Sequence, residues 1–121
     1  LVAVVACDMP FASAEILRGA AQLLTEEGAD AALPEWQGGL EPMHAVYRRS
    51  TCLPAVEAAI DRDMWKAIDW LPQVKLRRLG AAELALWDPA GLAFSNVNTP
   101  EEFLRAEALA SADDQHRAGR V

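Results

Sequence analysis

The chain opens with a continuous apolar run, Leu1 to Cys7, which is followed at once by Asp8, Met9 and Pro10. An apolar run of this length, without the alternation of a half-exposed strand, is typical of a strand buried on both faces of a parallel sheet. Pro10 lacks a backbone N–H and therefore ends the ladder. We expect a buried strand over residues 1–7 whose partners include strands before residue 1, and hence a chain that is part of a longer protein.

Beyond this run, the sequence alternates further strand signals with helical ones. Ser13 is a suitable N-cap for a helix over residues 14–27, which Gly28 ends. Further strands are expected over residues 30–33, 43–47, 74–79 and 93–95, with a loop over 34–41, and further helices after Ser50 or Thr51 and over 63–71. This alternation predicts an α/β fold with a mainly parallel sheet, in which ligands bind outside the carboxyl ends of the strands.

The last helix has the strongest start signal in the chain. Thr99 as N-cap, Pro100 in the first turn and Glu102 three residues after the cap make a capping box. We expect residues 1–110 to form the C-terminal part of one domain, and residues 111–121, which are polar and without pattern, to be a loose tail.

Composition and charge exclude several function classes. The formal net charge is −7 and no Lys/Arg cluster is present, so a site for a nucleic-acid backbone is not expected. No apolar stretch approaches the roughly 20 residues of a membrane span. Cys7 and Cys52 have no Cys or His partner at metal-site spacing, and we expect both to be buried, reduced thiols of a cytoplasmic protein.

Asp8 is the strongest candidate for chemistry, because it follows the buried strand at the end where α/β sheets bind ligands. A carboxylate in this position is partly desolvated and needs a partner. One such partner is Mg²⁺ held jointly with substrate phosphates. The alternative is structural, with the Asp8 side chain capping the turn made by Met9 and Pro10.

Asn96 and Asn98 precede the last helix and offer both donor and acceptor groups. Such amides suit recognition of a heterocycle or a phosphate. They also bond readily to nearby backbone, which is the alternative interpretation.

A glycine-rich turn precedes the strand over residues 43–47. It can let backbone approach a ligand, or simply reverse the chain. His44 has no oriented partner in the sequence, so a structural role is expected for it rather than a catalytic one. Trp36, before the turn, is free to lie against a ligand.

Three strings resemble, in order and spacing, those of molybdenum cofactor guanylyltransferases. They are Val5-Ala6-Cys7-Asp8-Met9-Pro10-Phe11, Glu41-Pro42-Met43-His44-Ala45-Val46-Tyr47 and Phe94-Ser95-Asn96-Val97-Asn98-Thr99-Pro100-Glu101-Glu102-Phe103. The resemblance covers roughly residues 1–110. The Asp-Met-Pro string is shared with many nucleotidyltransferases, whereas Asn-Val-Asn-Thr-Pro is more specific to the guanylyl members.

The resemblance implies a Rossmann-like nucleotidyltransferase sheet and an enzyme that joins GMP from GTP to molybdopterin, with Mg²⁺ and with release of pyrophosphate. It implies that Asp8 is catalytic and helps to hold Mg²⁺ and the GTP phosphates. It also implies that Asn96, Asn98, Glu41 and Pro42 lie on the molybdopterin side of the cleft. Molybdoenzymes or molybdenum-insertion proteins are the implied protein partners.

The chain also departs from this family. The glycine-rich N-terminal loop that grips the nucleotide, and a strand-end Asp that precedes Asp8, do not occur in residues 1–121. The family resemblance also implies a pair of basic residues near Met64, of which this chain retains only Lys66, with Arg62 nearby. We therefore expect an incomplete sheet and an inactive chain when it acts alone. Three alternatives stay open: a related nucleotidyltransferase with another acceptor, a non-catalytic binding module, or a truncated product that folds poorly.

Overall fold

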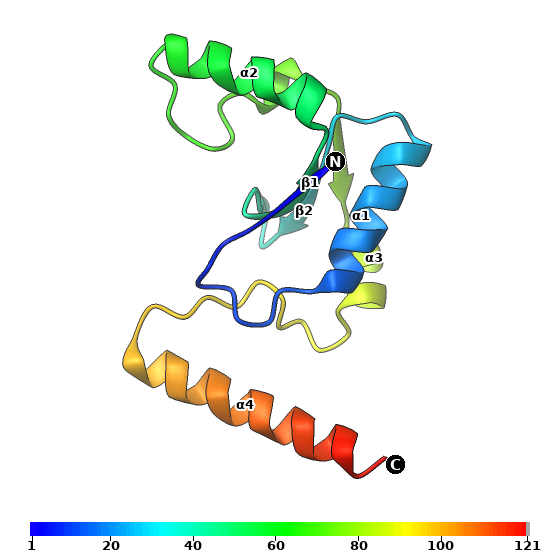
Figure 1. The fold of residues 1–121 in the computed structure, drawn as a ribbon, viewed down its shortest axis with the longest axis vertical. Coiled ribbons are helices and arrows are strands. Elements are labelled where there is room, and N and C mark those ends of the chain that lie inside the picture. Colours follow the sequence, from blue (N-terminus) through cyan, green and yellow to red (C-terminus); the bar gives the residue numbers. More distant parts are fainter. Residues whose placement is uncertain (121) are drawn as a thin grey trace.

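A twisted sheet with helices on both faces is the centre of the molecule (Figure 1), and the computed structural model of the protein describes residues 1–120. Strand β4 (His44–Tyr47) lies between β1 (Val2–Val5) and β2 (Ala31–Trp36). Strand β5 (Leu76–Leu79) also pairs with β2, and the short β3 (Gly39–Leu40) pairs with the far end of β2.

The prediction of a mainly parallel sheet is wrong. β4 runs antiparallel to both β1 and β2, β3 is antiparallel to β2, and within residues 1–120 the parallel pair is β2 with β5. The reason is the length of the connection, because residues 37–43 are too few for the crossover of about a dozen residues that a parallel neighbour needs. Gln37 and Gly38 instead adopt positive φ angles of 49° and 79°, as in a tight hairpin turn.

The strand predicted over residues 1–7 is not buried on both faces. Val2 and Val5 of β1 are 42% and 38% exposed, and Cys7 is also exposed, contrary to the expectation for this thiol. Among the described residues only β4 pairs with β1, so the side chains of β1 have less cover than those of β4, all of which are buried.

Helices α1 (Ala14–Glu26) and α3 (Ala81–Trp87) cover one face of the sheet. α1 begins as predicted, with the Ser13 hydroxyl oxygen accepting a hydrogen bond from the Ile16 N–H at 3.2 Å. The buried residues of α1 form one core with residues of β2, β4 and β5. This core contains Ile16, Ala20, Leu24, Ala29, Ala32, Val46, Leu79, Leu84, Ala93 and Phe94.

Helix α2 (Arg49–Asp61) and the short 3-10 helix η1 (Leu71–Gln73) cover the other face. No Ser50 or Thr51 side chain caps α2, which follows Arg48 directly. The helix predicted over residues 63–71 is replaced by turns, which begin where Asp63 takes a positive φ of 57°. The core on this face contains Ala31, Leu33, Ala45, Tyr47, Cys52 and Leu71.

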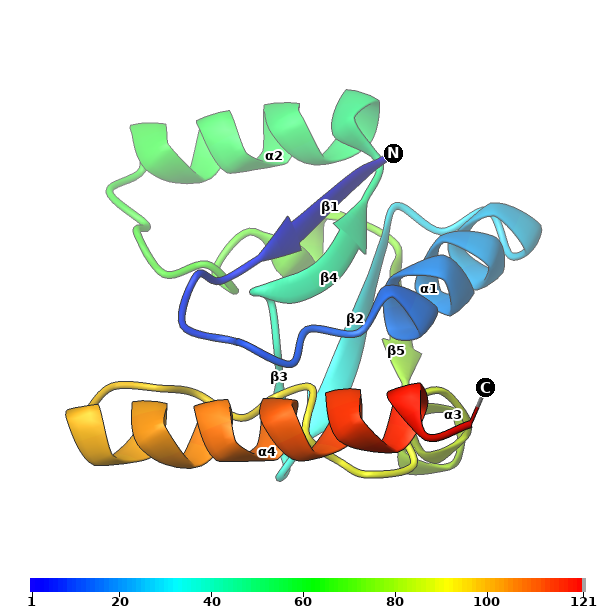
Figure 2. The ribbon, with the colours of Figure 1, turned by 60° about the horizontal axis from the view of Figure 1, so that its bottom comes forward.

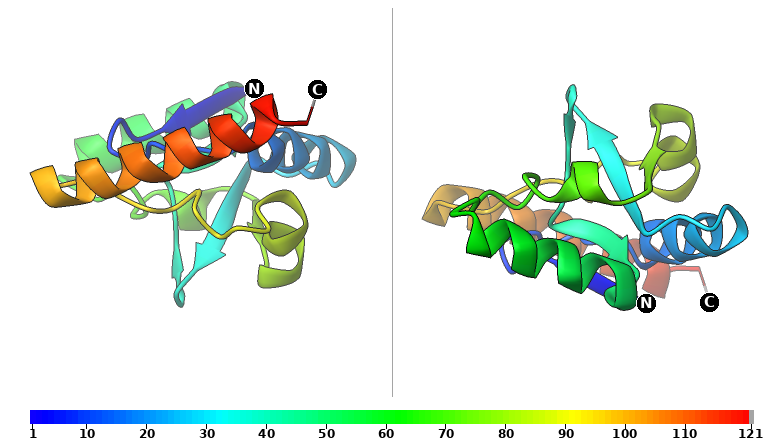
Figure 3. Two further views of the ribbon diagram at one scale, coloured as in Figure 1. Left: turned by 90° about the horizontal axis from the view of Figure 1, so that it is seen from below. Right: turned by 90° about the horizontal axis from the view of Figure 1, so that it is seen from above.

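Helix α4 (Pro100–Ala118) lies beyond the end of the sheet toward which β2 and β5 point (Figures 1 and 2), and the left view of Figure 3 shows it crossing in front of the strands. It begins with the predicted capping box at Thr99 and Glu102. None of its residues within the described chain is buried, and it stays helical to Ala118 where a loose tail was expected. Among residues 1–120, no helix has the length and apolar character to cross a membrane.

Candidate functional site

The carboxyl ends of β1 and β2 and the start of β4 meet at one end of the sheet. Because β4 is antiparallel to its neighbours, its first residues lie beside the last residues of β1, with Val5 opposite His44. The Ala6 N–H continues this pairing by donating to the Met43 carbonyl oxygen at 2.8 Å. The chain therefore brings Asp8, which follows β1, and Glu41, which precedes β4, to the same end.

The loop over residues 93–98 crosses this end of the sheet. The Ala93 N–H donates to the Asp88 carboxylate at 2.9 Å, and the Val97 N–H donates to the Asp8 carbonyl oxygen at 2.9 Å. The predicted strand over 93–95 is absent, and these residues form a turn. The contact between Val97 and Asp8 joins two of the three strings that carry the family resemblance.

Asp8 lies on one side of this loop, in a cavity of about 530 Å³ that we name the Asp8 pocket. The pocket is lined by Cys7, Asp8, Pro10, Phe11, Val97, Phe103, Ala106, Glu107 and Ala110. Asp8 is half-buried, and within residues 1–120 its carboxylate accepts no hydrogen bond, so the alternative structural role, a cap of the following turn, is not observed.

The Asp8 carboxylate fits a magnesium ion whose other ligands come from water and a substrate. Among the described residues there is no cluster of three or more side chains of the His, Cys, Asp and Glu types that could enclose a metal. Mg²⁺ in nucleotide enzymes commonly takes one or two protein carboxylates and completes its shell with water and phosphate oxygens. A single half-buried carboxylate without an internal hydrogen bond matches that pattern.

Glu41 and Asn96 lie on the other side of the loop, in a second cavity of about 400 Å³ that we name the Trp36 pocket. Its lining comprises Trp36, Gln37, Gly39, Leu40, Glu41, Phe94, Ser95 and Asn96. The rings of Trp36 and Phe94 pack with their centroids 5.0 Å apart and their planes tilted by 36°. One Glu41 carboxylate oxygen accepts a hydrogen bond from the Met43 N–H at 3.0 Å, which fixes the carboxylate near the pocket.

Pro42 and Asn98 line neither of these pockets. Pro42 borders an apolar groove of about 340 Å³ between β1 and α2, together with Val2 and Trp70. Its carbonyl oxygen accepts a hydrogen bond at 2.6 Å from the hydroxyl of Tyr47, whose pKa is raised by burial. The Asn98 N–H donates to the Glu102 carboxylate at 2.7 Å as part of the start of α4.

His44 has a structural role in this arrangement, as expected. It is fully buried, and its Nε2 accepts a hydrogen bond from the Ser13 N–H at 2.9 Å, which joins β4 to the start of α1. Its ring packs edge-on against Phe94, with centroids 5.4 Å apart. Burial lowers the pKa of His44, and the Nδ1 atom is buried without a hydrogen-bond partner in the described structure.

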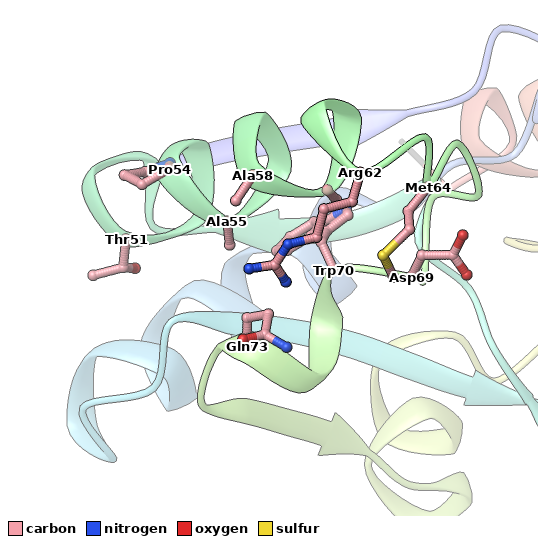
Figure 4. Close-up of a pocket in the computed structure, with 10 residues that line it drawn as sticks. Thr51, Pro54, Ala55, Ala58, Arg62, Met64, Asp69, Trp70 and Gln73 are labelled. Atoms are coloured by element: carbon pink, nitrogen blue, oxygen red, sulfur yellow. The ribbon is translucent and has the colours of Figure 1, made fainter.

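A fourth cavity, of about 300 Å³, lies along α2 and is distinct from the Asp8 pocket and the Trp36 pocket (Figure 4). Figure 4 shows Arg62 extending its guanidinium from the end of α2 past Trp70 toward Gln73. This cavity shares no lining residue with the Asp8 pocket or the Trp36 pocket. Arg62 therefore lies outside the end of the sheet where the predicted site residues gather.

Sequence reasoning gave no role to two residues that line the pockets. Phe94 forms part of the aromatic wall of the Trp36 pocket, and Glu107 of α4 is a second carboxylate on the Asp8 pocket. A large aromatic residue immediately before the Ser-Asn string was a usable signal for Phe94. Glu107 lies in an exposed stretch of helix whose sequence gives no such signal.

Comparisons with known proteins identify the family of this chain. The family model described as the MobA-like NTP transferase domain matches residues 1–76. A curated relative from Pelotomaculum thermopropionicum, named probable molybdenum cofactor guanylyltransferase, is 36% identical over 118 residues, which cover 98% of this chain and 55% of the relative. The molybdenum cofactor guanylyltransferase of Desulfosudis oleivorans is 31% identical over 107 residues, covering 88% of this chain and 52% of the relative.

A solved structure is similar over most of the chain. The crystal structure of molybdopterin-guanine dinucleotide biosynthesis protein A from Archaeoglobus fulgidus matches with a TM-score of 0.79 and 30% identity, covering 91% of this chain and 55% of the solved one. The chain thus spans about half the length of the curated relatives it matches.

Proposed function

The chain belongs to the MobA-like NTP transferase family, and we propose that it contributes the acceptor side and a catalytic carboxylate to a molybdenum cofactor guanylyltransferase. In this proposal GMP is transferred from GTP to molybdopterin, and pyrophosphate is released. The enzyme class follows the names of the relatives, which describe guanylyltransferases. The observation that carries the proposal is the Val97–Asp8 hydrogen bond, because it sets the Asp8 pocket and the Trp36 pocket side by side at one end of the sheet.

The proposed reaction is an in-line displacement at the α-phosphorus of GTP. A phosphate oxygen of molybdopterin forms the new bond to that phosphorus, and the bond to the bridging oxygen of pyrophosphate breaks. No covalent intermediate with the protein is needed, so the rate depends on positioning and on charge stabilisation. Asp8 would hold Mg²⁺ together with the phosphates, and the ion would offset the charge of the departing pyrophosphate.

The remaining site residues act on the acceptor in this proposal. Glu41 and Asn96 orient its heterocycle from the Trp36 pocket, whereas Pro42 and Asn98 support the turns on either side. The exposed Cys7 thiol and the buried Cys52 thiol are both free, which suits a protein of the reducing cytoplasm. Molybdoenzymes or molybdenum-insertion proteins would receive the product.

A chimeric enzyme tests this function. The part of the Pelotomaculum relative that the match leaves uncovered is joined to residues 1–121, and pyrophosphate release is measured with GTP, Mg²⁺ and molybdopterin. We expect release that depends on molybdopterin, and a decrease of about 100-fold or more for Asp8→Asn, the range seen when a group stabilising transition-state charge is removed. Asp61→Asn, at the exposed end of α2, is the matched control and should leave the rate unchanged.

Two results would contradict the proposal. One is a folded chimera, judged by circular dichroism, that binds molybdopterin but releases no pyrophosphate. The other is full activity in the Asp8→Asn variant.

Acceptor binding without transfer is the second candidate function. It is favoured by the Trp36 pocket, which residues 1–121 form by themselves from an aromatic wall and polar side chains. Calorimetric titration of the chain by itself tests the acceptor binding that both candidates require. Molybdopterin binding with no measurable binding of GTP and Mg²⁺ is expected for this chain alone, and the chimera then decides whether transfer occurs.

A further inference from the structure

Trp36 lies at the end of β2, beyond the part of the strand that pairs with β4. β2 continues past its pairing with β4 into a two-stranded ribbon, in which Glu35 pairs with Leu40 and Trp36 pairs with Gly39. The residue directly across from Trp36 therefore has no side chain, and it leaves the indole uncovered on the ribbon. Trp36 is accordingly 36% exposed although it is part of a strand.

Phe94 supports the Trp36 ring from the protein side. Phe94 is only 6% exposed and packs against Trp36 and against the edge of the buried His44. His44 is in turn fixed by its hydrogen bond from the Ser13 N–H. The row Trp36–Phe94–His44 thus gives the Trp36 pocket an aromatic wall that is anchored in the core.

The polar groups of the same pocket have a definite hydrogen-bonding character. Glu41 has one carboxylate oxygen bound by the Met43 N–H, and its remaining capacity can only accept hydrogen bonds. The Asn96 side chain can both donate and accept, and within residues 1–120 no hydrogen bond occupies it. A ligand with adjacent N–H donors beside a carbonyl or ring-nitrogen acceptor satisfies both.

The 2-aminopyrimidin-4-one ring has this combination. Its amino group and ring N–H form a pair of donors that match a carboxylate, and its carbonyl oxygen matches an amide N–H. Adenine fits poorly, because the ring nitrogens beside its amino group are acceptors and would face the carboxylate. The pocket volume of about 400 Å³ lies in the range of small-molecule sites.

We propose that Trp36, supported by Phe94, stacks on the 2-aminopyrimidin-4-one ring of the acceptor while Glu41 and Asn96 bind the polar edge of that ring. Pterins and guanine share this ring, and the assignment to the pterin acceptor rests on the proposed function. In this arrangement Trp36 sets specificity by requiring a flat ring, and Glu41 sets it by requiring the paired donors.

Binding of pterin probes to residues 1–121 tests the proposal without any transfer reaction. Neopterin, guanosine and adenosine are titrated, with quenching of pterin fluorescence and calorimetry as readouts. We expect neopterin to bind more tightly than guanosine and adenosine not to bind. Trp36→Ala should weaken neopterin binding by about 10-fold or more, the scale of base stacking on an aromatic side chain, whereas Trp36→Phe should retain most of it.

Matched variants keep the test decisive. Trp65→Ala, which removes a 72% exposed indole outside the pocket, should leave binding unchanged. Glu41→Gln should reduce the preference for neopterin over adenosine, because an amide can also donate to an acceptor ring nitrogen. Far-ultraviolet circular dichroism of each variant checks that the ribbon substitutions leave the fold intact.

Three results would overturn the inference: unchanged neopterin binding in Trp36→Ala, equal binding of adenosine and neopterin, or tighter binding of guanosine than of neopterin. These results are independent of pyrophosphate release by the chimera. A chimera that transfers GMP with an unaltered KM for molybdopterin after Trp36→Ala would reject the stacking role and leave the proposed function intact.

Discussion

Gly19 in the middle of α1 is required by the ring of Trp87, and replacing it with alanine should destabilise the protein. A methyl group at this position would lie 2.7 Å from the Cη2 atom of Trp87 and still nearer to two other atoms of the same ring. Real side chains do not approach so closely, so α3 or its tryptophan must move away from α1. Gly19→Ala therefore tests whether α1 and α3 pack as closely as the structure shows.

Two opposing effects decide the size of the change. Alanine favours a helix interior over glycine by about 1 kcal/mol. Overpacking a contact of this kind costs about 1–3 kcal/mol. The free energy of unfolding should therefore fall by about 1 kcal/mol, which urea titration followed by circular dichroism at 222 nm resolves as a lower midpoint with an unchanged slope.

The Trp87→Leu background is the control for Gly19→Ala, because a leucine side chain ends before the ring atoms that the new methyl group would meet. There the packing penalty is removed and only the helix term remains, so Gly19→Ala should raise the free energy of unfolding by about 0.5–1 kcal/mol. A stabilising effect of Gly19→Ala beside the native Trp87 would refute the packing argument.

Three further predictions concern a cap, a buried ring and an ion pair. Thr99→Ala removes the cap of α4 and should cost about 1 kcal/mol locally, measured as faster amide exchange in its first turn, whereas an unchanged exchange rate would contradict the capping role. Burial lowers the pKa of His44 below its usual 6.5, so as the pH falls the imidazole is protonated in the unfolded chain before it is protonated in the folded one. The contribution of neutral His44 to the free energy of unfolding should therefore be fully present above pH 6.5 and be lost as the pH drops through the folded pKa. Urea midpoints between pH 5 and 7.5 should show this slope, His44→Gln should flatten it, and the exposed His116→Gln should not. The Arg77 side chain is 23% exposed and pairs with two carboxylates, so Arg77→Ala should lower the free energy of unfolding by about 1–2 kcal/mol. The control is Arg78→Ala, at a side chain that is 61% exposed, which should change the urea midpoint little. Equal effects of the two substitutions would show that the paired carboxylates of Arg77 add no stability.

Local side-chain chemistry made the helix starts predictable. Ser13 and Thr99 cap their helices as the sequence indicates, because these hydrogen bonds depend on residues within the same turn. The two faces of β4 were also predictable, with Val46 in one core and Ala45 and Tyr47 in the other. The direction of β4 was missed, although the short connection over residues 37–43 already required a hairpin.

The candidate site was predictable in part for a related reason. Asp8, Glu41 and Asn96 reach the same end of the sheet because strand ends gather there, which is a general property of the fold class. Pro42 is the sequence neighbour of Glu41 but lines a different groove, since successive residues of an extended chain face opposite sides. Asn98 lines neither pocket, and its backbone N–H binds the Glu102 carboxylate at the start of α4. That alternation depends on the register of each turn, which the sequence alone does not define.

Because β4 runs antiparallel to β2, the two strands are joined by a surface hairpin whose length can change without altering the sheet. Residues 37–43 shape one wall of a pocket, yet they connect two adjacent strands and carry no crossover helix. A surface hairpin of this kind tolerates insertions at little cost in loop-closure entropy. Lengthening this turn should therefore reshape the wall of the Trp36 pocket while the strands that hold Asp8 keep their places.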